Sequence, residues 1–246
     1  MSRTDPVRVL VVEHEAGAPA ALLGQWLQQA GADLDVRRPY AGDDLPDTLD
    51  DHDALLVLGG SMGAHDDADH WWLEPTKALV RRAAEERVTT LGVCLGHQLA
   101  AVALGGRSAR NPAGQQLGLL PVGWTWAVHD DPLFAAAPGA AGRGLHWNDD
   151  VVVEQPPGTV VLALAPGGEL QVARYAPTVW GVQLHPEVDE AIVRGWHEED
   201  PDRHAEGVVG PVLAAVTEAR DELERSWRPL AEQLVALARQ PREAYP

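Results

Sequence analysis

Cysteine and lysine are nearly absent from this chain of 246 residues, which contains only Cys94 and Lys77 of these two types. A single cysteine excludes an internal disulfide and fits a reducing compartment. Because the other basic residues are arginines, we interpret the scarcity of lysine as compositional bias. The lone cysteine is therefore a candidate for chemistry and not for a structural crosslink.

Long apolar runs are also absent. No stretch of 18 apolar residues occurs, and the N-terminal segment MSRTDPVRVLVVE lacks the uninterrupted apolar region of a secretory signal peptide. We therefore expect a cytoplasmic protein that does not enter a membrane.

Positive charge is scarce as well. The chain has 19 Lys and Arg against 37 Asp and Glu, a formal net charge of -18. Such a field repels nucleic acids and anionic membranes, so we expect neither as a partner, and solubility explains the charge sufficiently. The apolar fraction of 45% is that of an ordinary globular protein, and the length allows a full hydrophobic core.

Apolar strands alternate with helical stretches in the first half of the chain, which predicts a parallel sheet covered on both faces. The predicted strands are residues 7–12, 34–37, 54–58 and 88–93, and the predicted helices are residues 19–30, 71–86 and 98–104.

Shorter strands, separated by Gly, Pro and Asp, follow after Gly105 and predict an antiparallel or mixed extension of the same sheet. We expect an α/β domain over residues 1–190 and a helical extension, packed on that domain, over residues 191–246. The later strands are predicted at residues 118–129, 144–147, 151–154, 160–165, 170–175 and 179–184.

An apolar stripe marks the C-terminal helical region, because large apolar residues recur there at steps of three and four. A terminal helix packed back on its own domain would bury this stripe; a homodimer or partner surface is the alternative. The stripe comprises Leu213, Val216, Leu223, Trp227, Leu230, Leu234 and Leu237.

Cys94 lies where a nucleophile is expected, between an apolar strand and a helix in the segment GVCLGHQ. The pattern G-x-C-x-G is the cysteine counterpart of a nucleophile elbow. Such a turn exposes the thiol at the carboxyl edge of the sheet and directs the first N–H groups of the helix toward it, which favours the thiolate. A small buried hydrophobic residue is the alternative interpretation.

A histidine and a carboxylate follow a later strand, in the segment WGVQLHPE. Residues two apart in an extended segment point to the same side, and Pro186 keeps His185 out of helical geometry, so Glu187 can reach the imidazole. Together with Cys94 these residues predict a Cys-His-Glu triad, in which a base activates the nucleophile and a carboxylate orients the base.

Acyl transfer also needs donors for the developing oxyanion. The glycine-rich segment after residue 58 lets backbone N–H groups approach a ligand, so we expect the N–H of Gly60 or Ser61 to act together with that of Leu95. A plain glycine turn is the alternative. A phosphate-binding loop is disfavoured, because no G-x-x-x-x-G-K-[ST] or G-x-G-x-x-G pattern occurs.

Several other polar groups receive structural interpretations. Glu13 and His14 are expected in a solvated loop, and His97 as a polar residue at a helix start. A run of metal-capable side chains falls where acids suit a helix N-terminus, so we expect no metal. That run consists of His65, Asp66, Asp67, Asp69 and His70.

Three motifs in fixed order, GGSMGA, GVCLGHQLA and GVQLHPEV, resemble the class I (triad) glutamine amidotransferase family over residues 7–188. The sequence pattern is similar to that of the stand-alone subgroup related to the amidotransferase domain of GMP synthase. The resemblance implies a flavodoxin-like, three-layer α/β sandwich around a mostly parallel, partly mixed central sheet, with a C-terminal helical extension, and it implies no cofactor.

The resemblance also implies roles for the residues of the motifs. Cys94 would form a γ-glutamyl thioester, His185 would act as base and acid, Glu187 would orient it, and Gly60 and Leu95 would bind the oxyanion. The implied substrate contacts are Gln98, Ser61, His146, Trp147 and Asn148.

Two positions depart from the pattern of the subgroup. Asn148 stands where His is expected in a His-Trp-His segment, and QQLGL at 115–119, with Gln115 and Gln116, replaces a Pro-Glu-Ile-Gly-Trp type of segment. Both changes bear on the choice of substrate and leave the triad intact.

Three functions are compatible with these motifs. The first is hydrolysis of glutamine to glutamate and ammonia, with the ammonia used by a separate ATP-dependent synthetase. The second is a self-sufficient hydrolase of other γ-glutamyl amides that releases an amine. The third is a non-catalytic binding or regulatory protein, against which the complete triad argues.

Overall fold

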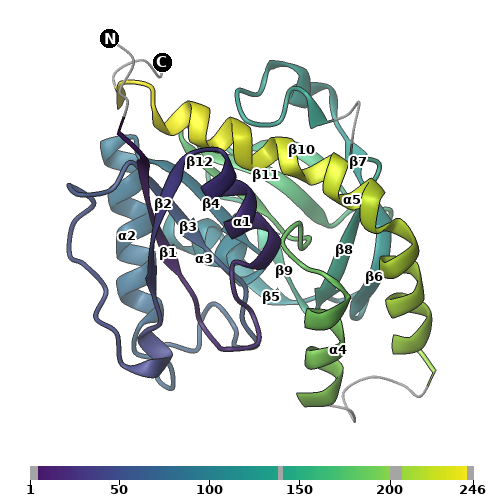
Figure 1. The fold of residues 1–246 in the computed structure, drawn as a ribbon. Coiled ribbons are helices and arrows are strands. Elements are labelled where there is room, and N and C mark those ends of the chain that lie inside the picture. Colours follow the sequence, from purple (N-terminus) through teal and green to yellow (C-terminus); the bar gives the residue numbers. More distant parts are fainter. Residues whose placement is uncertain (1–4, 138–140, 200–206, 243–246) are drawn as a thin grey trace.

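The computed structural model describes residues 5–137, 141–199 and 207–242. An eight-stranded sheet forms the centre, in the order β2-β1-β3-β4-β12-β11-β10-β7 (Figure 1). The strands from β2 to β12 pair in parallel, and β11, β10 and β7 pair antiparallel. This confirms the predicted α/β class and its mostly parallel, partly mixed sheet. The strands are β1 Val7–Val12, β2 Ala32–Arg37, β3 Ala54–Val57, β4 Thr89–Val93, β7 Gly123–Trp124, β10 Val160–Leu164, β11 Leu170–Ala176 and β12 Val179–Val182.

Two small antiparallel sheets stand beside the central one, β5 with β9 and β6 with β8. The prediction of one strand over residues 118–129 is wrong: β6 ends at Pro121, β7 joins the central sheet, and the short 3-10 helix η2 follows. A Cβ on Gly123 would lie 2.3 Å from the carbonyl oxygen of Leu164, so glycine permits the chain to change sheets here. The remaining elements are β5 Arg107–Arg110, β6 Gln116–Pro121, β8 Arg143–Asn148, β9 Asp150–Glu154, η1 Pro39–Ala41 and η2 Trp126–Asp130.

Helices cover both faces of the central sheet (Figure 1): α1 and α5 lie on one face, and α2 and α3 on the other. Helix α3 begins at Leu95, three residues before the predicted start, so its first turn directly follows Cys94. Within the described ranges, no helix is both long and apolar enough to cross a membrane. The helices are α1 Ala21–Gln29, α2 Leu73–Glu86, α3 Leu95–Ala103, α4 Glu190–Glu199 and α5 Val209–Ala238.

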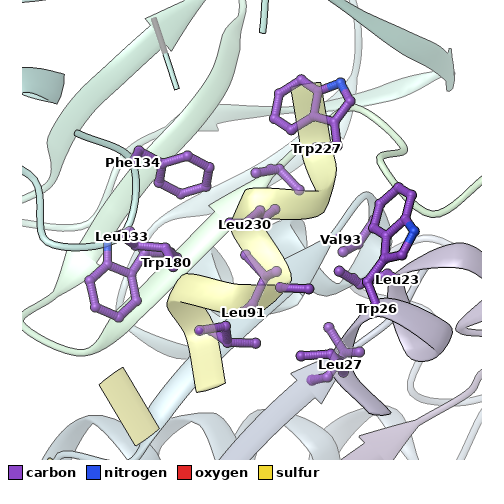
Figure 2. Packing of buried hydrophobic residues seen from close by; sticks show 14 of the residues in the cluster. Leu23, Trp26, Leu27, Leu91, Val93, Leu133, Phe134, Trp180, Trp227 and Leu230 are labelled. Atoms are coloured by element: carbon purple, nitrogen blue, oxygen red, sulfur yellow. The ribbon is translucent and has the colours of Figure 1, made fainter. Parts of the chain in front are cut away.

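Most of the apolar stripe of α5 is buried against its own chain. Trp227 and Leu230 pack with Leu23 and Trp26 of α1 over strand β4, as Figure 2 shows. The exposed fraction of Trp227 is 2% and that of Leu234 is 1%. Val216, Trp227, Leu230, Leu234 and Leu237 are buried against their own chain, as in the first of the two alternatives, whereas Leu213 and Leu223 are half-buried.

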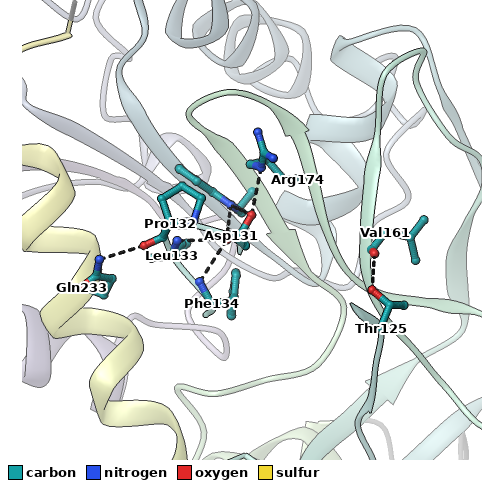
Figure 3. A network of polar contacts seen from close by, with 9 residues as sticks. Thr125, Asp131, Pro132, Leu133, Phe134, Val161, Arg174 and Gln233 are labelled. Carbon is teal, nitrogen blue, oxygen red and sulfur yellow. Dashed lines mark hydrogen bonds and ion pairs between the residues drawn. The ribbon is translucent and has the colours of Figure 1, made fainter. Parts of the chain in front are cut away.

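Asp131, just after η2, is a buried carboxylate that ties η2 to the central sheet. It accepts hydrogen bonds from the backbone N–H groups of Leu133 and Phe134, from the indole of Trp180, and from Arg174 at 2.9 Å (Figure 3). A buried charge is tolerated when its lone pairs are satisfied in this way. The contact fixes the loop that lies against α5, where Gln233 donates to the carbonyl of Pro132.

Candidate active site

Cys94 occupies a sharp turn between β4 and α3. Its backbone has φ 50° and ψ -105°, a conformation that is strained for a residue with a side chain. The flanking glycines are needed because a Cβ on Gly92 would lie 2.3 Å from the carbonyl oxygen of Gly96, and one on Gly96 would lie 2.0 Å from that of Val57. The sequence G-x-C-x-G is therefore set by close backbone approaches on both sides of the cysteine.

His185 and Glu187 form a buried pair directly after β12. The Nδ1 atom of His185 lies 2.7 Å from Oε1 of Glu187, and both side chains are almost fully buried. Because β12 pairs in parallel with β4, both strands end at the same edge of the sheet. The ring of Trp196, on α4, packs edge-on against the imidazole at 4.9 Å between centroids.

The histidine and the cysteine meet above Gly59. A Cβ on Gly59 would lie 3.3 Å from Cε1 of His185 and 3.6 Å from Cβ of Cys94. Nε2 of His185 is buried and has no hydrogen-bond partner among the described residues. Gln183, two residues before His185 on the same extended segment, directs its Nε2 to the sulfur of Cys94 at 3.5 Å.

Electrostatics favour a protonated His185. Burial lowers the pKa of His185, but the negative charges of Glu187 and Cys94 and the hydrogen bond with Glu187 outweigh it and raise this pKa from 6.5 to about 10. The imidazolium is thus held between a carboxylate and the sulfur. This is the arrangement in which a histidine can give a proton to a leaving group.

The predicted oxyanion donors lie close to one another. A Cβ on Gly60 would lie 3.0 Å from the side chain of Leu95. Within the described part of the chain, the backbone N–H groups of Gly60 and Leu95 have no hydrogen-bond partner. The N–H of Ser61 instead donates to the carboxylate of Glu15 at 3.1 Å, and the hydroxyl of Ser61 donates to the same oxygen. Gly60 and Ser61 were the two residues expected to supply the oxyanion donor of this loop. Of these two, only Gly60 has a backbone N–H without a hydrogen-bond partner among the described residues.

A cavity of about 560 Å³ opens in front of Cys94 and His185. Its lining comes from the loops after β1 and β3, from α3 and α4, and from the turn between β8 and β9. The lining residues are Glu15, Ala18, Gly60, Ser61, Met62, Gly63, Asp66, Cys94, Gln98, Arg110, Trp147, Asn148, Asp149, Asp150, His185 and Trp196.

Most of the predicted substrate contacts line this cavity, but His146 does not. His146 is fully buried behind it, with Nδ1 3.2 Å from Asn148 Oδ1 and Nε2 3.0 Å from Gln171 Nε2. Gln98 uses its amide nitrogen within the protein, donating to the carbonyl of Asp150 and to Gln183. Gln98 therefore has only its carbonyl oxygen to offer to a ligand.

The two departures from the subgroup pattern contact each other. Gln116 and Asn148 are directly opposed in the β6–β8 pair, and Asn148 Nδ2 donates to Gln116 Oε1 at 3.1 Å. Asn148 also donates to the carbonyl of Asp150 at 3.1 Å. A pair of neutral amides, of which Asn148 lines the cavity, thus stands where the subgroup pattern would place a histidine and a glutamate.

Other residues singled out in the sequence are structural. The prediction that Glu13 and His14 lie in a solvated loop is wrong, because both are buried. Glu13 pairs with Arg38 at 2.7 Å, and His14 accepts a hydrogen bond from the indole of Trp72. Burial, with a smaller contribution from the charge of His70, lowers the pKa of His14 to about 3. The expected solvation fails because the loop folds back under the start of α1, where Glu13 accepts from the N–H of Ala20.

His97 is also buried and joins α3 to β12. Its ring lies 3.1 Å from the hydroxyl of Tyr175 and fills the space beside Gly181, where a Cβ would lie 2.3 Å from Nδ1. Burial lowers the pKa of His97 to about 3, so the ring is neutral. It thereby braces the helix of Cys94 against the strand that leads to His185.

The acidic loop that precedes α2 makes local contacts. Asp66 accepts from the N–H of Gly63 at 2.7 Å, and Asp67 pairs with Lys77. Among the described residues, no three His, Cys, Asp or Glu side chains are grouped closely enough to hold a metal ion.

Several residues at the site did not emerge from the sequence. Gln183 could have been found, because it points to the same side of its strand as His185. Trp196, Arg110 and Glu15 reach the cavity from separate elements, and no local pattern marks them.

Comparison with known proteins gives a consistent picture. The family model for class-I glutamine amidotransferases matches residues 20–192. The glutamine amidotransferase-like protein YfeJ of Salmonella typhimurium is 29% identical over 94% of this chain and 98% of its own length. A crystal structure of a glutamine amidotransferase from Thermotoga maritima superposes with a TM-score of 0.82 at 22% identity, covering 93% of this chain and 98% of that one, and shows the same fold.

Two further relatives match a shorter part of the chain. A glutamine-hydrolysing GMP synthase subunit from Saccharolobus solfataricus is 30% identical over 64% of this chain and 78% of its own. Gamma-glutamyl peptidase 5 of Arabidopsis thaliana is 26% identical over 66% of this chain and 65% of its own.

Proposed function

This chain belongs to the class-I glutamine amidotransferase family, and from that premise we propose that it hydrolyses a γ-glutamyl amide through a thioester on Cys94. The observation that carries the proposal is the meeting of Cys94 with the buried His185–Glu187 pair at the floor of a cavity. The chemistry needs neither a metal nor a cofactor, because nucleophile, acid and oxyanion donors are all supplied by the chain.

The first half-reaction forms the acyl-enzyme. The Cys94 thiolate attacks the carbonyl carbon of the amide, and the oxyanion that forms accepts hydrogen bonds from the N–H groups of Gly60 and Leu95. His185 transfers its proton to the amide nitrogen, the C–N bond breaks, and ammonia or an amine leaves. Glu187 keeps the imidazole oriented throughout.

The second half-reaction restores the enzyme. His185, now neutral, takes a proton from water as the hydroxyl adds to the thioester carbonyl. The C–S bond then breaks, which releases glutamate and returns Cys94 to the thiolate and His185 to the imidazolium. The net change is one water consumed for each amide bond cleaved.

The leaving group distinguishes two forms of this function. By likeness to the GMP synthase relative, ammonia from glutamine would pass to a separate ATP-dependent synthetase. By likeness to the gamma-glutamyl peptidase, the chain alone would release an amine from another γ-glutamyl amide. Both forms share Cys94, His185 and Glu187.

The test is release of ammonia or amine from glutamine and a panel of γ-glutamyl amides by the purified chain. Cys94→Ala and His185→Ala should lower kcat/KM by about 10³-fold or more, while His129→Ala, which changes an exposed histidine outside the cavity, should leave it unchanged. Turnover of glutamine only after a synthetase is added would favour the first form.

A non-catalytic role is the competing outcome. It predicts no turnover of any amide and no covalent labelling of Cys94 by a glutamine-like chloroketone, as read by peptide mass. Either turnover or labelling that disappears in Cys94→Ala would exclude it.

A further inference from the structure

The cavity in front of Cys94 carries an excess of negative charge. Four carboxylates line it, against the guanidinium of Arg110 and the imidazolium of His185, whose charge is balanced by Glu187. Arg110 pairs with Asp149 at 2.9 Å and approaches Asp150 at 3.6 Å, so its charge is already matched.

Glu15 and Asp66 carry the unmatched charge. Among the described residues, Glu15 bonds to the N–H and hydroxyl of Ser61, and Asp66 bonds to the N–H of Gly63, all of them neutral donors. Within the described part of the chain, neither carboxylate has a positively charged partner. A cleft lined by one sign of charge concentrates ligands of the opposite sign.

Two indole rings form an aromatic wall of the same cavity. Trp147 and Trp196 pack at 5.7 Å between centroids, and both line the cavity. Trp196 also touches His185, the residue that protonates the leaving nitrogen. A leaving group longer than ammonia would therefore emerge beside an indole, and indole faces attract alkylammonium groups.

The size of the cavity fits a substrate longer than glutamine. At about 560 Å³, it falls within the range of roughly 300–1,000 Å³ that is typical of pockets for drug-sized ligands. The buried Nε2 of His185, which has no partner among the described residues, marks the end at which the reacting bond would lie.

We propose that the chain selects γ-glutamyl amides of amines that carry a further positive charge, such as α,ω-diamines and longer polyamines. The proposal rests on the hydrolytic function proposed above and specifies its leaving group. The γ-glutamyl part of the substrate carries one α-ammonium and one α-carboxylate, so it does not balance the negative charge of Glu15 and Asp66. An ammonium group at the far end of the leaving amine balances it.

The test compares three amides that differ mainly in terminal charge. The γ-glutamyl amides of 1,4-diaminobutane, n-pentylamine and 4-aminobutyrate end in a cation, a methyl group and an anion, on chains of similar length. At low salt, kcat/KM should be about tenfold higher for the cationic than for the neutral amide, and lowest for the anionic one. Added salt should reduce these ratios, because it screens the carboxylates.

Charge-removing variants locate the effect. Glu15→Gln and Asp66→Asn keep an acceptor for Ser61 and Gly63, and each should lower the cationic-to-neutral ratio by about twofold to fivefold, the scale expected for partly exposed charges. Asp69→Asn makes the same change in the same loop outside the cavity, and it should leave the ratio unchanged.

The outcomes separate this inference from the function on which it rests. Cleavage of the three amides at equal rates, or ratios that salt and the two variants do not alter, would overturn the preference for cations and leave the hydrolytic function standing. Absence of Cys94-dependent cleavage of these amides and of glutamine would remove both.

Discussion

At the scale of single residues, the site depends on how the negative charges of Glu187 and Cys94 act on His185. His185 is buried, and burial alone would make its imidazole neutral. Glu187 and Cys94 reverse this and raise the pKa of His185 to about 10. The proton needed by the leaving group is therefore already on the imidazole at neutral pH, and Glu187 is the group that keeps it there.

The first prediction concerns Glu187→Gln, which removes the charge but keeps a side chain of similar shape. The pKa of His185 should fall by more than one unit, so the alkaline limb of kcat/KM against pH should move from near pH 10 toward neutral pH, with a loss in kcat of about 10²-fold or more. Where turnover is too slow, an NMR titration of the His185 imidazole measures the same pKa directly.

The same pKa has a consequence for stability. Because folding raises the pKa of His185 above its ordinary 6.5, the stabilisation linked to its proton is complete below about pH 6.5 and is lost as the pH rises through about 10. Glu187→Gln should remove much of this dependence, whereas Glu198→Gln, an exposed acid on α4, should not. A variant whose profile coincides with that of the wild type would show that Glu187 does not control the imidazole.

At the scale of elements, the strand-turn-helix of β4 and α3 positions the nucleophile. The positive φ of Cys94 is held by its neighbours: its N–H donates to Val182 of β12, and the N–H of Gly96 donates to Leu58. The turn is thus fixed on both sides by the strands that also carry His185 and Gly60. Strain at the nucleophile is stored because the surrounding sheet leaves the backbone no alternative.

The second prediction concerns Gly96→Ala. The new Cβ would lie 2.0 Å from the carbonyl oxygen of Val57, a backbone atom in the centre of the sheet, so α3 or β3 must shift. We expect a loss of about 2–4 kcal/mol in the free energy of unfolding, together with loss of activity. Gly195→Ala is the matched control, because nothing lies within 4 Å of its Cβ in α4, and it should stabilise by about 0.5–1 kcal/mol. Equal urea midpoints for the two variants would contradict the role given to Gly96.

The strand-turn-helix of β4 and α3 could be predicted well from the sequence, whereas other elements could not, for physical reasons. Apolar runs and glycines are local signals, so the parallel strands and the turn at Cys94 could be identified. At the break after β6, Pro121 and Gly123 are also local signals, but they do not show that the chain changes sheets, because that depends on a contact between Gly123 and Leu164, 41 residues later. Likewise, both Asn148 and Gln116 stand out in the sequence, but only the β6–β8 register shows that they bond to each other.

At the scale of the whole molecule, α5 holds distant segments together. Arg143 of β8 forms a double ion-pair contact with Glu222, and Arg239 donates to the carbonyl of Ala30 at the end of α1. Gln233 reaches the loop at Pro132. The helix crosses the face of the sheet from the small β6–β8 pair to the N-terminal strands (Figure 1), and its apolar side chains from Trp227 onward are part of the main core.

The third prediction tests whether α5 belongs to that core energetically. Trp227 is buried beside Trp124 and donates its indole N–H to the carbonyl of Arg143. Trp227→Ala should lower the free energy of unfolding by about 3–5 kcal/mol, because it leaves a cavity and an unpaired carbonyl. Trp126→Ala removes the same side chain at a position that is 85% exposed and should change it by less than about 0.5 kcal/mol.

Urea unfolding followed by far-ultraviolet circular dichroism measures both effects and also the cooperativity. If α5 and the sheet share one core, helix and strand signals should be lost in a single transition in both variants, shifted to lower urea in Trp227→Ala alone. A separate early transition confined to helix would show instead that α5 is an appendage, and so would a Trp227→Ala variant as stable as Trp126→Ala. In that case the apolar stripe would be free to leave the sheet, and a partner surface on α5 would again have to be considered.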